Sequence, residues 1–525
     1  MAPTYVALDL ETTGLDPERE EIIEVGAVRF SEGGVEETFH TLVNPRRPLS
    51  YRIQLLTGIA AEELESAPFF AEVASDLEAF IGAYPVVGQN VAFDLGFLAR
   101  QGIVPSGPTY DTFELASLLL TELSERSLGS LARHLGVEFP VQHRALADAA
   151  AAQQVFLALR ARLAALPPEL LAEAERIASL TDWPLRHLLR EVSAERPALP
   201  GAAVAEAGGL VHGVVRRPSE PGSAPVPSER VRPVDPDEVV AILESAGRRP
   251  GIIHEFEERP EQLRMAGAVA EVLNDGHDLI VEAGTGIGKS LAYLIPAACY
   301  ALRNGSRAVV STNTISLQEQ LMGQDIPIVR LLLEGWSPDG EPFEPEDLRV
   351  AQLKGRRNYL CLLRWATLRH SAALNAEEAR MLVRLLLWLP RSETGDRAEI
   401  NLTRAEEPVW NRLNAQNESC LTALCPYVRD GSCFLLRARK RAEASHLLVV
   451  NHALLLSDVA AGGNVLPGYA HLVVDEAQHL EDEATEQFGF HTGEGEITRL
   501  LDRAHERVAG REGGLAVGLR NATRG

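Results

Sequence analysis

Two carboxylates, Asp9 and Glu11, stand two residues apart in an otherwise apolar segment near the start of the chain. Side chains two apart on a β-strand leave the same face, so both charges project together while Leu8 and Leu10 point to the opposite face. Two like charges held side by side require a cation. The segment is therefore expected to be a strand of an α/β core that presents a cation site.

Strand and helix patterns alternate over residues 1–162. Strands are expected at Tyr5–Glu11 and Ile22–Phe30, and helices around Ala71–Ile81 and Leu115–Leu135. This alternation predicts that the first domain has an α/β fold.

A second domain is expected after a linker. Residues 163–235 begin with the pattern of short helices and then turn to Pro, Gly, Ser and Ala without apolar periodicity. A new helix is expected to begin with Asp235 as its cap and Pro236 in its first turn. Residues 236–525 are therefore expected to form a second α/β domain.

Composition limits the setting in which the chain works. It has 525 residues, of which 46% are hydrophobic and 24% charged, and its formal net charge is −24. No apolar run reaches the roughly 18 residues of a membrane span and no leader sequence is visible, so we expect a cytoplasmic protein without a membrane partner. The acidic balance argues against a wholly basic surface, so contacts with DNA are expected from local grooves or through bound metal ions.

Three further residues complete a cluster with Asp9 and Glu11. Asp94 ends an apolar stretch where a helix is expected to begin, and Asp148 opens an alanine-rich helix that His143 precedes on a loop. Taken singly, these residues can be explained without any catalytic role, as strand-edge acids, helix caps and a surface histidine. Taken together, the four acids provide ligands for two Mg²⁺ or Mn²⁺ ions about 3.5–4 Å apart, and His143 provides a base for the attacking water.

This set resembles the DnaQ-like exonucleases of the DEDDh type. The resemblance rests on the run Asp-Leu-Glu-Thr-Thr-Gly-Leu from Asp9, on Asn90 with Asp94, and on His143 with Asp148. It implies an RNase H-like fold and 3′-to-5′ exonuclease activity, with His143 as the general base. It also implies four metal ligands, Asp9, Glu11, Asp94 and Asp148, and three residues that grip the terminal nucleotide, Thr13, Leu15 and Phe93.

The segment from Asp278 to Ser290 reads as a buried strand, a glycine-rich turn and a helix start. Backbone N–H groups of such a turn cradle phosphates. Lys289 is expected to reach the β- and γ-phosphates of ATP and Ser290 to bind its Mg²⁺. The expected loop residues are Ala283, Gly284, Thr285, Gly286, Ile287 and Gly288, with Ala283 in the place of the usual first glycine.

A second nucleotide motif begins at His471, where a buried strand is expected to end in Asp475 and Glu476. Asp475 is expected to hold Mg²⁺ through water, and Glu476 to activate the hydrolytic water. Two upstream segments resemble helicase motifs: Arg259 with Gln262 resembles an adenine-reading motif, and Thr312 with Thr314 resembles a loop that touches single-stranded DNA.

About 185 residues separate Lys289 from Asp475, more than a P-loop domain needs, so an insert is expected at about residues 350–440. Four cysteines lie in it, and their spacing alone leaves zinc and iron–sulfur equally open. The fifth, Cys299, is expected in the core. The four expected ligands are Cys361, Cys420, Cys425 and Cys433.

A cysteine-bearing insert between these two motifs resembles the iron–sulfur helicases of the DinG and XPD kind, and the fused exonuclease favours the DinG-like ones. The resemblance implies a RecA-like P-loop domain, a [4Fe–4S] cluster and ATP-dependent unwinding of single-stranded or forked DNA, with RNA not excluded as a nuclease substrate. Arginines that flank the cysteines are expected to line a basic groove, or alternatively a solvated helix face. They are Arg356, Arg357, Arg364, Arg437, Arg439 and Arg441, together with Lys440.

The sequence departs from this family in two ways. The acid box reads Asp475, Glu476, Ala477, Gln478, where the family usually has histidine in the fourth place. Only about 50 residues follow the box, so the second motor domain is expected to be absent and the chain to bind ATP but to hydrolyse and unwind poorly. Alternatively, the P-loop half is only an ATP-responsive nucleic-acid-binding module.

Overall fold

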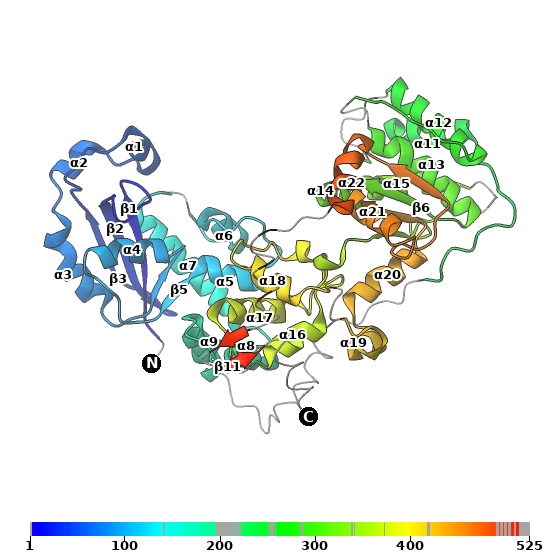
Figure 1. Ribbon diagram of the computed structural model, residues 1–525. Coiled ribbons are helices and arrows are strands. Elements are labelled where there is room, and N and C mark those ends of the chain that lie inside the picture. Colours follow the sequence, from blue (N-terminus) through cyan, green and yellow to red (C-terminus); the bar gives the residue numbers. More distant parts are fainter. Residues whose placement is uncertain are drawn as a thin grey trace, which may run out of the picture. The chain divides into compact units, whose positions relative to one another are not determined.

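The computed structural model (Figure 1) describes residues 3–139, 142–195, 222–249 and most of 251–489, together with Val215 and a few short stretches beyond 489. The chain divides into two compact units. The first combines residues 1–219 with 356–437, and the second combines 220–355 with 438–525. The cysteine-bearing insert therefore interrupts the second unit in chain order but belongs to the first in space.

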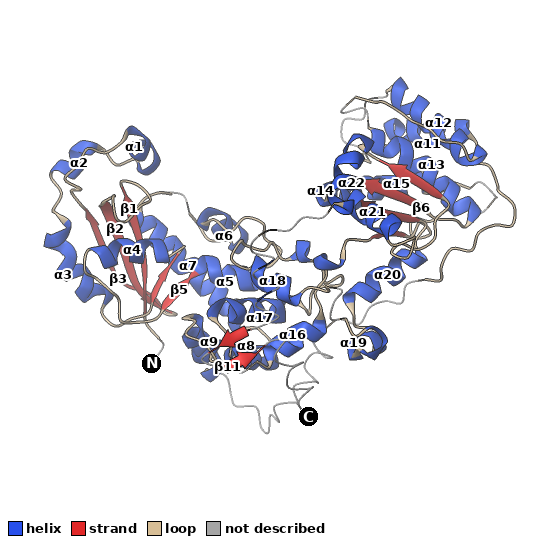
Figure 2. Ribbon diagram, viewed as in Figure 1, coloured by secondary structure: helices blue, strands red, loops and turns tan. Residues whose placement is uncertain are grey.

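The first unit contains a five-stranded sheet in the order β3-β2-β1-β4-β5 (Figure 2). β1, β2 and β3 are antiparallel neighbours, while β4 and β5 run parallel to β1, which lies in the middle. The expected α/β core and its first two strands are confirmed. The strands are β1 (Tyr5–Thr12), β2 (Ile22–Ser31), β3 (Gly34–Leu42), β4 (Val86–Gly88) and β5 (Thr109–Asp111).

Helices surround this sheet, and α7 packs against β1 and β2. Its Phe156 meets Tyr5 and Phe30 in edge-on ring contacts of the core. The single helix expected near Leu115–Leu135 is two helices, because Ser127 caps a new one. The helices are α1 (Tyr51–Thr57), α2 (Ala61–Glu65), α3 (Phe70–Ile81), α4 (Ala92–Arg100), α5 (Thr112–Leu119), α6 (Leu128–Leu135), α7 (Ala145–Ala164), α8 (Pro168–Ala178) and α9 (Leu185–Ala194).

The insert is helical, and its apolar side chains continue the core of residues 3–195 without a break. Three tryptophans of the insert, Trp365, Trp388 and Trp410, are among the largest fully buried side chains of the described chain, as is Trp183 of the α8–α9 connection. The insert helices are α16 (Leu362–Arg369), α17 (Ala376–Trp388), α18 (Glu407–Leu413), α19 (Pro426–Arg429) and α20 (Phe434–Ala444), and the boundary between the units falls within α20.

The second unit contains a parallel sheet in the order β7-β8-β6-β9. Its strands are β6 (Ala308–Thr312), β7 (Val350–Gln352), β8 (Leu447–Asn451) and β9 (His471–Val474). As expected, Asp235 caps the first helix, α11. The helices are α11 (Pro236–Arg248), α12 (Pro260–Asp275), α13 (Lys289–Asn304), α14 (Ile315–Gln320), α15 (Ile326–Leu333), α21 (His452–Ala460) and α22 (Leu480–Phe488).

The prediction of a buried strand before the glycine-rich turn is wrong. Residues 277–284 have no regular secondary structure, and Ile280 is 98% exposed. No described strand pairs with this segment, so its backbone N–H and C=O groups form no inter-strand hydrogen bonds with the described strands. The expected burial of the strand at His471 is also wrong, because β9 is an edge strand and stays partly exposed.

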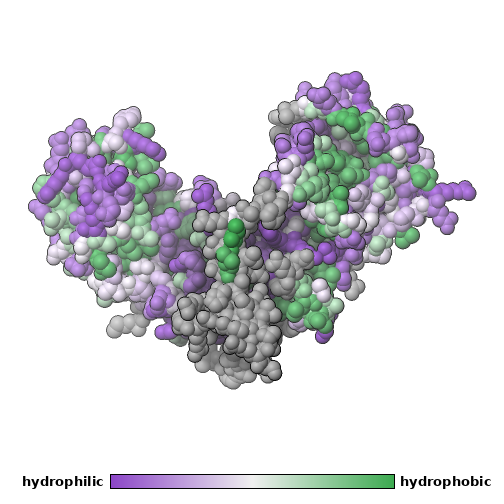
Figure 3. All heavy atoms as spheres, viewed as in Figure 1, coloured by the Kyte–Doolittle hydropathy of each residue, from purple (hydrophilic) through white to green (hydrophobic). Residues whose placement is uncertain are grey.

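Hydrophilic side chains cover much of the visible face of each unit (Figure 3), in keeping with the net charge of −24. No helix in the described part of the chain combines the length and apolar composition that a membrane span needs.

Candidate active site

β1 positions the first two acids. Asp9 lies opposite Gly26 and Glu11 opposite Glu24 on the neighbouring strand. Leu8 is fully buried and Leu10 nearly so, whereas both acids are only partly buried. The two-residue period therefore separates the acids from the apolar face as the sequence predicted.

Asp94 joins the acids from the first turn of α4, where a helix start was expected. Its side chain is buried, and its Oδ1 accepts a hydrogen bond of 2.9 Å from the amide of Leu10, between the two acids of β1. The turn before α4 passes through Asn90 at φ 53°, a left-handed conformation that few side chains adopt. The Asn90 amide donates to Asp111 Oδ1 over 3.0 Å, which fixes that turn.

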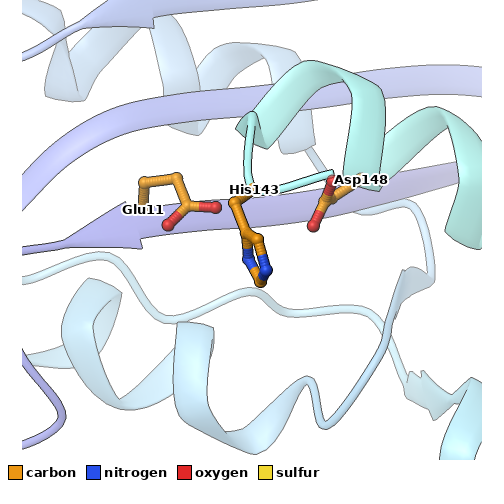
Figure 4. A group of neighbouring side chains, drawn as sticks. All are labelled: Glu11, His143 and Asp148. Carbon is orange, nitrogen blue, oxygen red and sulfur yellow. The ribbon is translucent and has the colours of Figure 1, made fainter. Parts of the chain in front are cut away.

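His143 and Asp148 approach from the start of α7. Ligand atoms of Glu11, His143 and Asp148 all lie within 4.8 Å of one another, and the imidazole stands between the two carboxylates in Figure 4. His143 is exposed and has φ 61°, the kind of strained backbone that gathers at functional sites. Oδ1 of Asp148 is buried and has no hydrogen-bond partner in the described part of the chain. An unsatisfied carboxylate oxygen beside two further ligands fits a hard divalent cation.

The acids perturb one another strongly. Burial, reinforced by the charges of Asp94, Asp148 and Glu11, raises the pKa of Asp9 well above its usual range. Burial likewise raises the pKa of Asp94. It raises the pKa of Glu11 to about 7 and that of Asp148 to about 6. Carboxylates that repel one another in this way favour a bound cation, which relieves the repulsion.

Sequence reasoning missed Glu24 of β2, which is fully buried. Its carboxylate accepts hydrogen bonds from the Arg144 guanidinium and from the Ala145 amide, the latter over 3.0 Å, and His40 Nε2 lies 2.7 Å away. Burial acts to raise the pKa of Glu24, but these hydrogen bonds outweigh it and lower the pKa. The signal available in the sequence was an acid in the middle of an apolar strand.

Gly26 explains how α7 comes so close to the sheet. A Cβ built on Gly26 would stand 2.2 Å from backbone atoms of Ala145 and Leu146. Only glycine permits this approach of strand and helix start. Glu24 and Gly26 together therefore hold the turn that carries His143 against β2.

The residues expected to grip a terminal nucleotide lie near this cluster in the chain. Leu15 is 85% exposed, which leaves its side chain available for contact. Thr13 donates a hydrogen bond to Glu20, and the ring of Phe93 lies 5.0 Å from that of Phe97. Their role stays a prediction.

The second unit brings the two nucleotide motifs together. Nζ of Lys289, at the start of α13, lies 2.6 Å from Oε1 of Glu476. The hydroxyl of Tyr293 donates to Asp475 over 3.1 Å. Hydrogen bonding to Lys289 is the main cause that lowers the pKa of Glu476. Lysine and both acids thus share one end of the parallel sheet, as the nucleotide site requires.

The glycine-rich loop is described only in part, because Thr285, Gly286 and Ile287 lie outside the described residues. Ala283 and Gly284 precede the gap, and Ser290 follows in the first turn of α13. Gly288 has φ 81° and caps α13, and its carbonyl accepts a 2.8 Å hydrogen bond from the Gln262 side chain.

Gln262 therefore faces the phosphate loop. Arg259, its neighbour in the expected adenine-reading motif, donates to Glu257. Thr312 ends β6, and Thr314 caps α14.

Three of the four insert cysteines lie near one another. Burial first, and the Cys425 thiol in addition, raise the pKa of Cys361. Burial also raises the pKa of Cys433, with contributions from Cys361 and Cys425. Cys420 is exposed and follows residues 417–419, which lie outside the described chain. Among the described residues, the cysteines do not form a group as tight as Glu11, His143 and Asp148. Cys299 is fully buried in the core, as expected.

The flanking arginines are not uniformly exposed. Arg437 is buried, with its guanidinium 5.4 Å from the Phe434 ring and its Nε donating to the Gly431 carbonyl. The basic groove stays a prediction for the others.

Two family models match the chain. Residues 6–156 match the family described as exonuclease, and residues 264–326 match the family described as DEAD/DEAH box helicase. The first range contains the acid cluster, by which we mean the four acids together with His143. The second range contains the described part of the phosphate loop. The cluster residues are Asp9, Glu11, Asp94, His143 and Asp148.

Curated relatives extend the similarity over nearly the whole chain. The 3′-5′ exonuclease DinG of Bacillus subtilis is 30% identical over 504 residues, which are 92% of this chain and 51% of the relative. The protein of the same name in Staphylococcus saprophyticus is 25% identical over 490 residues, again 92% of this chain and 51% of the relative. The ATP-dependent helicase DinG of Mycobacterium tuberculosis is 38% identical over 242 residues, 43% of this chain and 35% of the relative. The chain thus spans about half the length of the DinG exonucleases that it matches. It is homologous to DinG proteins over 92% of its length and contains an exonuclease domain followed by a DEAD/DEAH box helicase domain.

Proposed function

We propose that this chain is a metal-dependent 3′-to-5′ exonuclease fused to the ATP-binding half of a DinG-type ATP-dependent DNA helicase. The observation that carries the nuclease is the convergence of Glu11, His143 and Asp148 within 4.8 Å, next to Asp9 and Asp94. The Bacillus and Staphylococcus relatives are named 3′-5′ exonucleases, which supports digestion in the 3′-to-5′ direction.

The four acids are the proposed ligands of Mg²⁺ or Mn²⁺. Two such ions would stabilise both the attacking and the leaving oxygen of a phosphodiester. His143 is exposed on its loop, so its imidazole can reach a water beside a bound strand and take the proton of that water. Asp94 anchors α4 to β1 through the Leu10 amide and so keeps the acids at a fixed separation. The terminal phosphodiester of single-stranded or forked DNA is the proposed substrate.

Lys289, Ser290, Asp475 and Glu476 are the proposed residues for ATP with Mg²⁺. The Lys289 ammonium would pair with the β- and γ-phosphates in place of Glu476, and Glu476 would then be free to act on water. Gln262 supports the loop through the Gly288 carbonyl.

Cys361, Cys420, Cys425 and Cys433 are the proposed ligands of a [4Fe–4S] cluster. Thiolates hold both zinc and iron–sulfur clusters, and the proximity of Cys361, Cys425 and Cys433 fits either. Measuring iron and acid-labile sulfide in the anaerobically purified chain tests the assignment. One zinc per chain without sulfide would overturn it.

A strand-digestion assay tests the nuclease. Single strands labelled at the 5′ end are incubated with Mn²⁺, and the same strands with a blocked 3′ end serve as the control for direction. We expect a ladder that shortens from the 3′ end. Asp9→Ala should abolish it, while Asp76→Ala, which removes an exposed acid of α3, should leave it unchanged. Full digestion by Asp9→Ala would disprove the assigned site.

The alternative is that the P-loop half only binds nucleic acid in response to ATP. Adding ATP and a forked duplex to the same assay separates the two. ATP-dependent strand separation favours the helicase, whereas altered DNA affinity without strand separation favours the module.

A further inference from the structure

The helices of the insert lie directly against the exonuclease region. α17 packs on both α5 and α8, and the three helices are neighbours in Figure 1. α17 is buried along most of its length, including Met381 and Leu385. A helix that is apolar on several faces belongs to the inside of a fold. In this unit α17 is therefore a core helix shared by the insert and the exonuclease.

A buried ion pair joins α8 to α16. Nε of Arg369 lies 3.4 Å from Oε1 of Glu173, and the two side chains are 1% and 9% exposed. Arg176 also binds Glu173, and its Nη2 donates to the Arg369 carbonyl over 3.1 Å. The Arg369 guanidinium lies 4.8 Å from the Trp365 ring. Removing one partner of such a pair leaves a buried charge, which strongly destabilises a fold.

A second polar contact joins three segments at Glu114 of α5. Its carboxylate accepts hydrogen bonds from Trp183 Nε1, over 2.9 Å, and from Arg380 Nε of α17. Near the end of α5, the Leu119 carbonyl accepts from Arg391 over 3.2 Å. The insert is thus tied to α5 at both ends of that helix.

α5 also borders the acid cluster. Asp111, which caps α5 by accepting from the Phe113 amide, accepts from the Asn90 amide as well. Asn90 lies in the turn that leads into α4 and Asp94. A displacement of α5 would therefore loosen the turn that positions a proposed metal ligand.

We infer that the cysteine-bearing insert is a structural partner of the exonuclease domain, docked on α5 and α8 through α16 and α17, so that the two open as one cooperative unit. The insert thereby acts on the nuclease, although in the sequence it interrupts the motor half. The docking inference is tested by the rate of backbone opening and not by strand digestion. A negative result for docking can therefore be distinguished from a negative result for the proposed nuclease.

Hydrogen exchange of the full chain, followed by mass spectrometry, tests the docking. Arg369→Ala should speed amide exchange in α8 and α5 at least tenfold and leave α13 of the second unit unchanged. Arg397→Ala is the matched control, because Arg397 pairs with Glu407 inside the insert. Faster exchange confined to the insert helices, with α5 and α8 unchanged, would overturn the inference.

A charge exchange at a partly exposed pair keeps the test valid if Arg369→Ala fails to fold. Glu114 and Arg380 are 22% and 32% exposed, so substitutions there are tolerable. Arg380→Glu alone should place like charges together and speed exchange in α5 several-fold. The double variant Glu114→Arg with Arg380→Glu should slow exchange in α5 relative to Arg380→Glu alone, because opposite charges again face each other. Restoration should be partial, because the Trp183 indole N–H loses its acceptor. Docking through this pair would be contradicted if α5 exchanged at the native rate in Arg380→Glu, or if exchange in the double variant were no slower than in Arg380→Glu.

Discussion

Glu24 and Arg144 face each other directly beside the proposed general base. Arg144 donates from Nε and Nη2 to the Glu24 carboxylate over distances of 2.9 to 3.2 Å, and His143 precedes Arg144 in the chain. Glu24 also accepts from the Ala145 amide, the first residue of α7. One buried carboxylate thus fastens the turn on the C-terminal side of the base.

Glu24→Gln should lower kcat of the nuclease without loss of folding. The amide keeps the size of the side chain but loses its charge, so the Arg144 guanidinium is held less firmly and His143 shifts. Misplacement of a catalytic group by about 1 Å costs on the order of 10²-fold in rate, and we expect a decrease of about 10- to 100-fold in kcat with KM nearly unchanged. Steady-state kinetics on single strands measures both.

The control for Glu24→Gln is Glu37→Gln on β3, where the carboxylate is exposed and pairs with Arg29. Equal losses in both variants would mean that general stability, and not the position of His143, explains the effect.

His143→Ala should remove the proton acceptor while the acids remain. General base catalysis contributes about 10²–10⁴-fold, so kcat should fall by that factor while the Mn²⁺ concentration needed for half-maximal rate changes little. Because the His143 side chain is exposed, added imidazole should restore part of the rate. A variant with native kcat would remove His143 from the mechanism, and lack of rescue with a raised Mn²⁺ requirement would make it a metal ligand instead.

Local patterns predicted the parts of the site that depend on neighbours in the chain. The two-residue period of a strand placed Asp9 and Glu11 on one face, and the helix-start pattern placed Asp94 and Asp148. These features need only backbone geometry over a few residues. The presence of the first α/β domain followed from the same patterns.

Contacts between distant segments escaped prediction. Glu24 and Arg144 are 120 residues apart, and only the folded sheet brings them together. Glu173 lies in the expected linker and Arg369 in the expected second domain, so nothing local marked them as partners. The apolar run around Ile280 has a strand pattern but finds no pairing strand in the described chain, and pairing, not propensity, makes a strand.

His446 should make the second unit sensitive to acid. Burial, with Arg349 and Arg307 nearby, lowers its pKa to about 4, compared with an ordinary value of 6.5. The folded state therefore binds fewer protons than the unfolded state between these values, so stability is full above pH 6.5 and falls as the pH drops toward 4. One such group loses about 1.4 kcal/mol per pH unit in that window, and we expect about 2 kcal/mol less stability at pH 5 than at pH 7.

Chemical denaturation at the two pH values, with α13 followed by hydrogen exchange, measures the loss assigned to His446. His446→Asn should flatten the pH dependence. An unchanged slope in this variant would assign the acid sensitivity to other groups.

Glu476→Gln should strengthen ATP binding to this chain. The Lys289 ammonium lies 2.6 Å from the Glu476 carboxylate, so a bound phosphate must displace that carboxylate. Both side chains are partly exposed, at 24% and 30%, and pairs of this kind contribute up to about 1 kcal/mol. Removing the competitor should therefore lower Kd for ATP by about two- to fivefold, as titration calorimetry would show, while Lys289→Ala should weaken binding. Glu481→Gln on α22 is the control, because this carboxylate is exposed and does not contact Lys289 among the described interactions. Weaker ATP binding by Glu476→Gln would mean that the carboxylate supports the loop more than it competes with the phosphate.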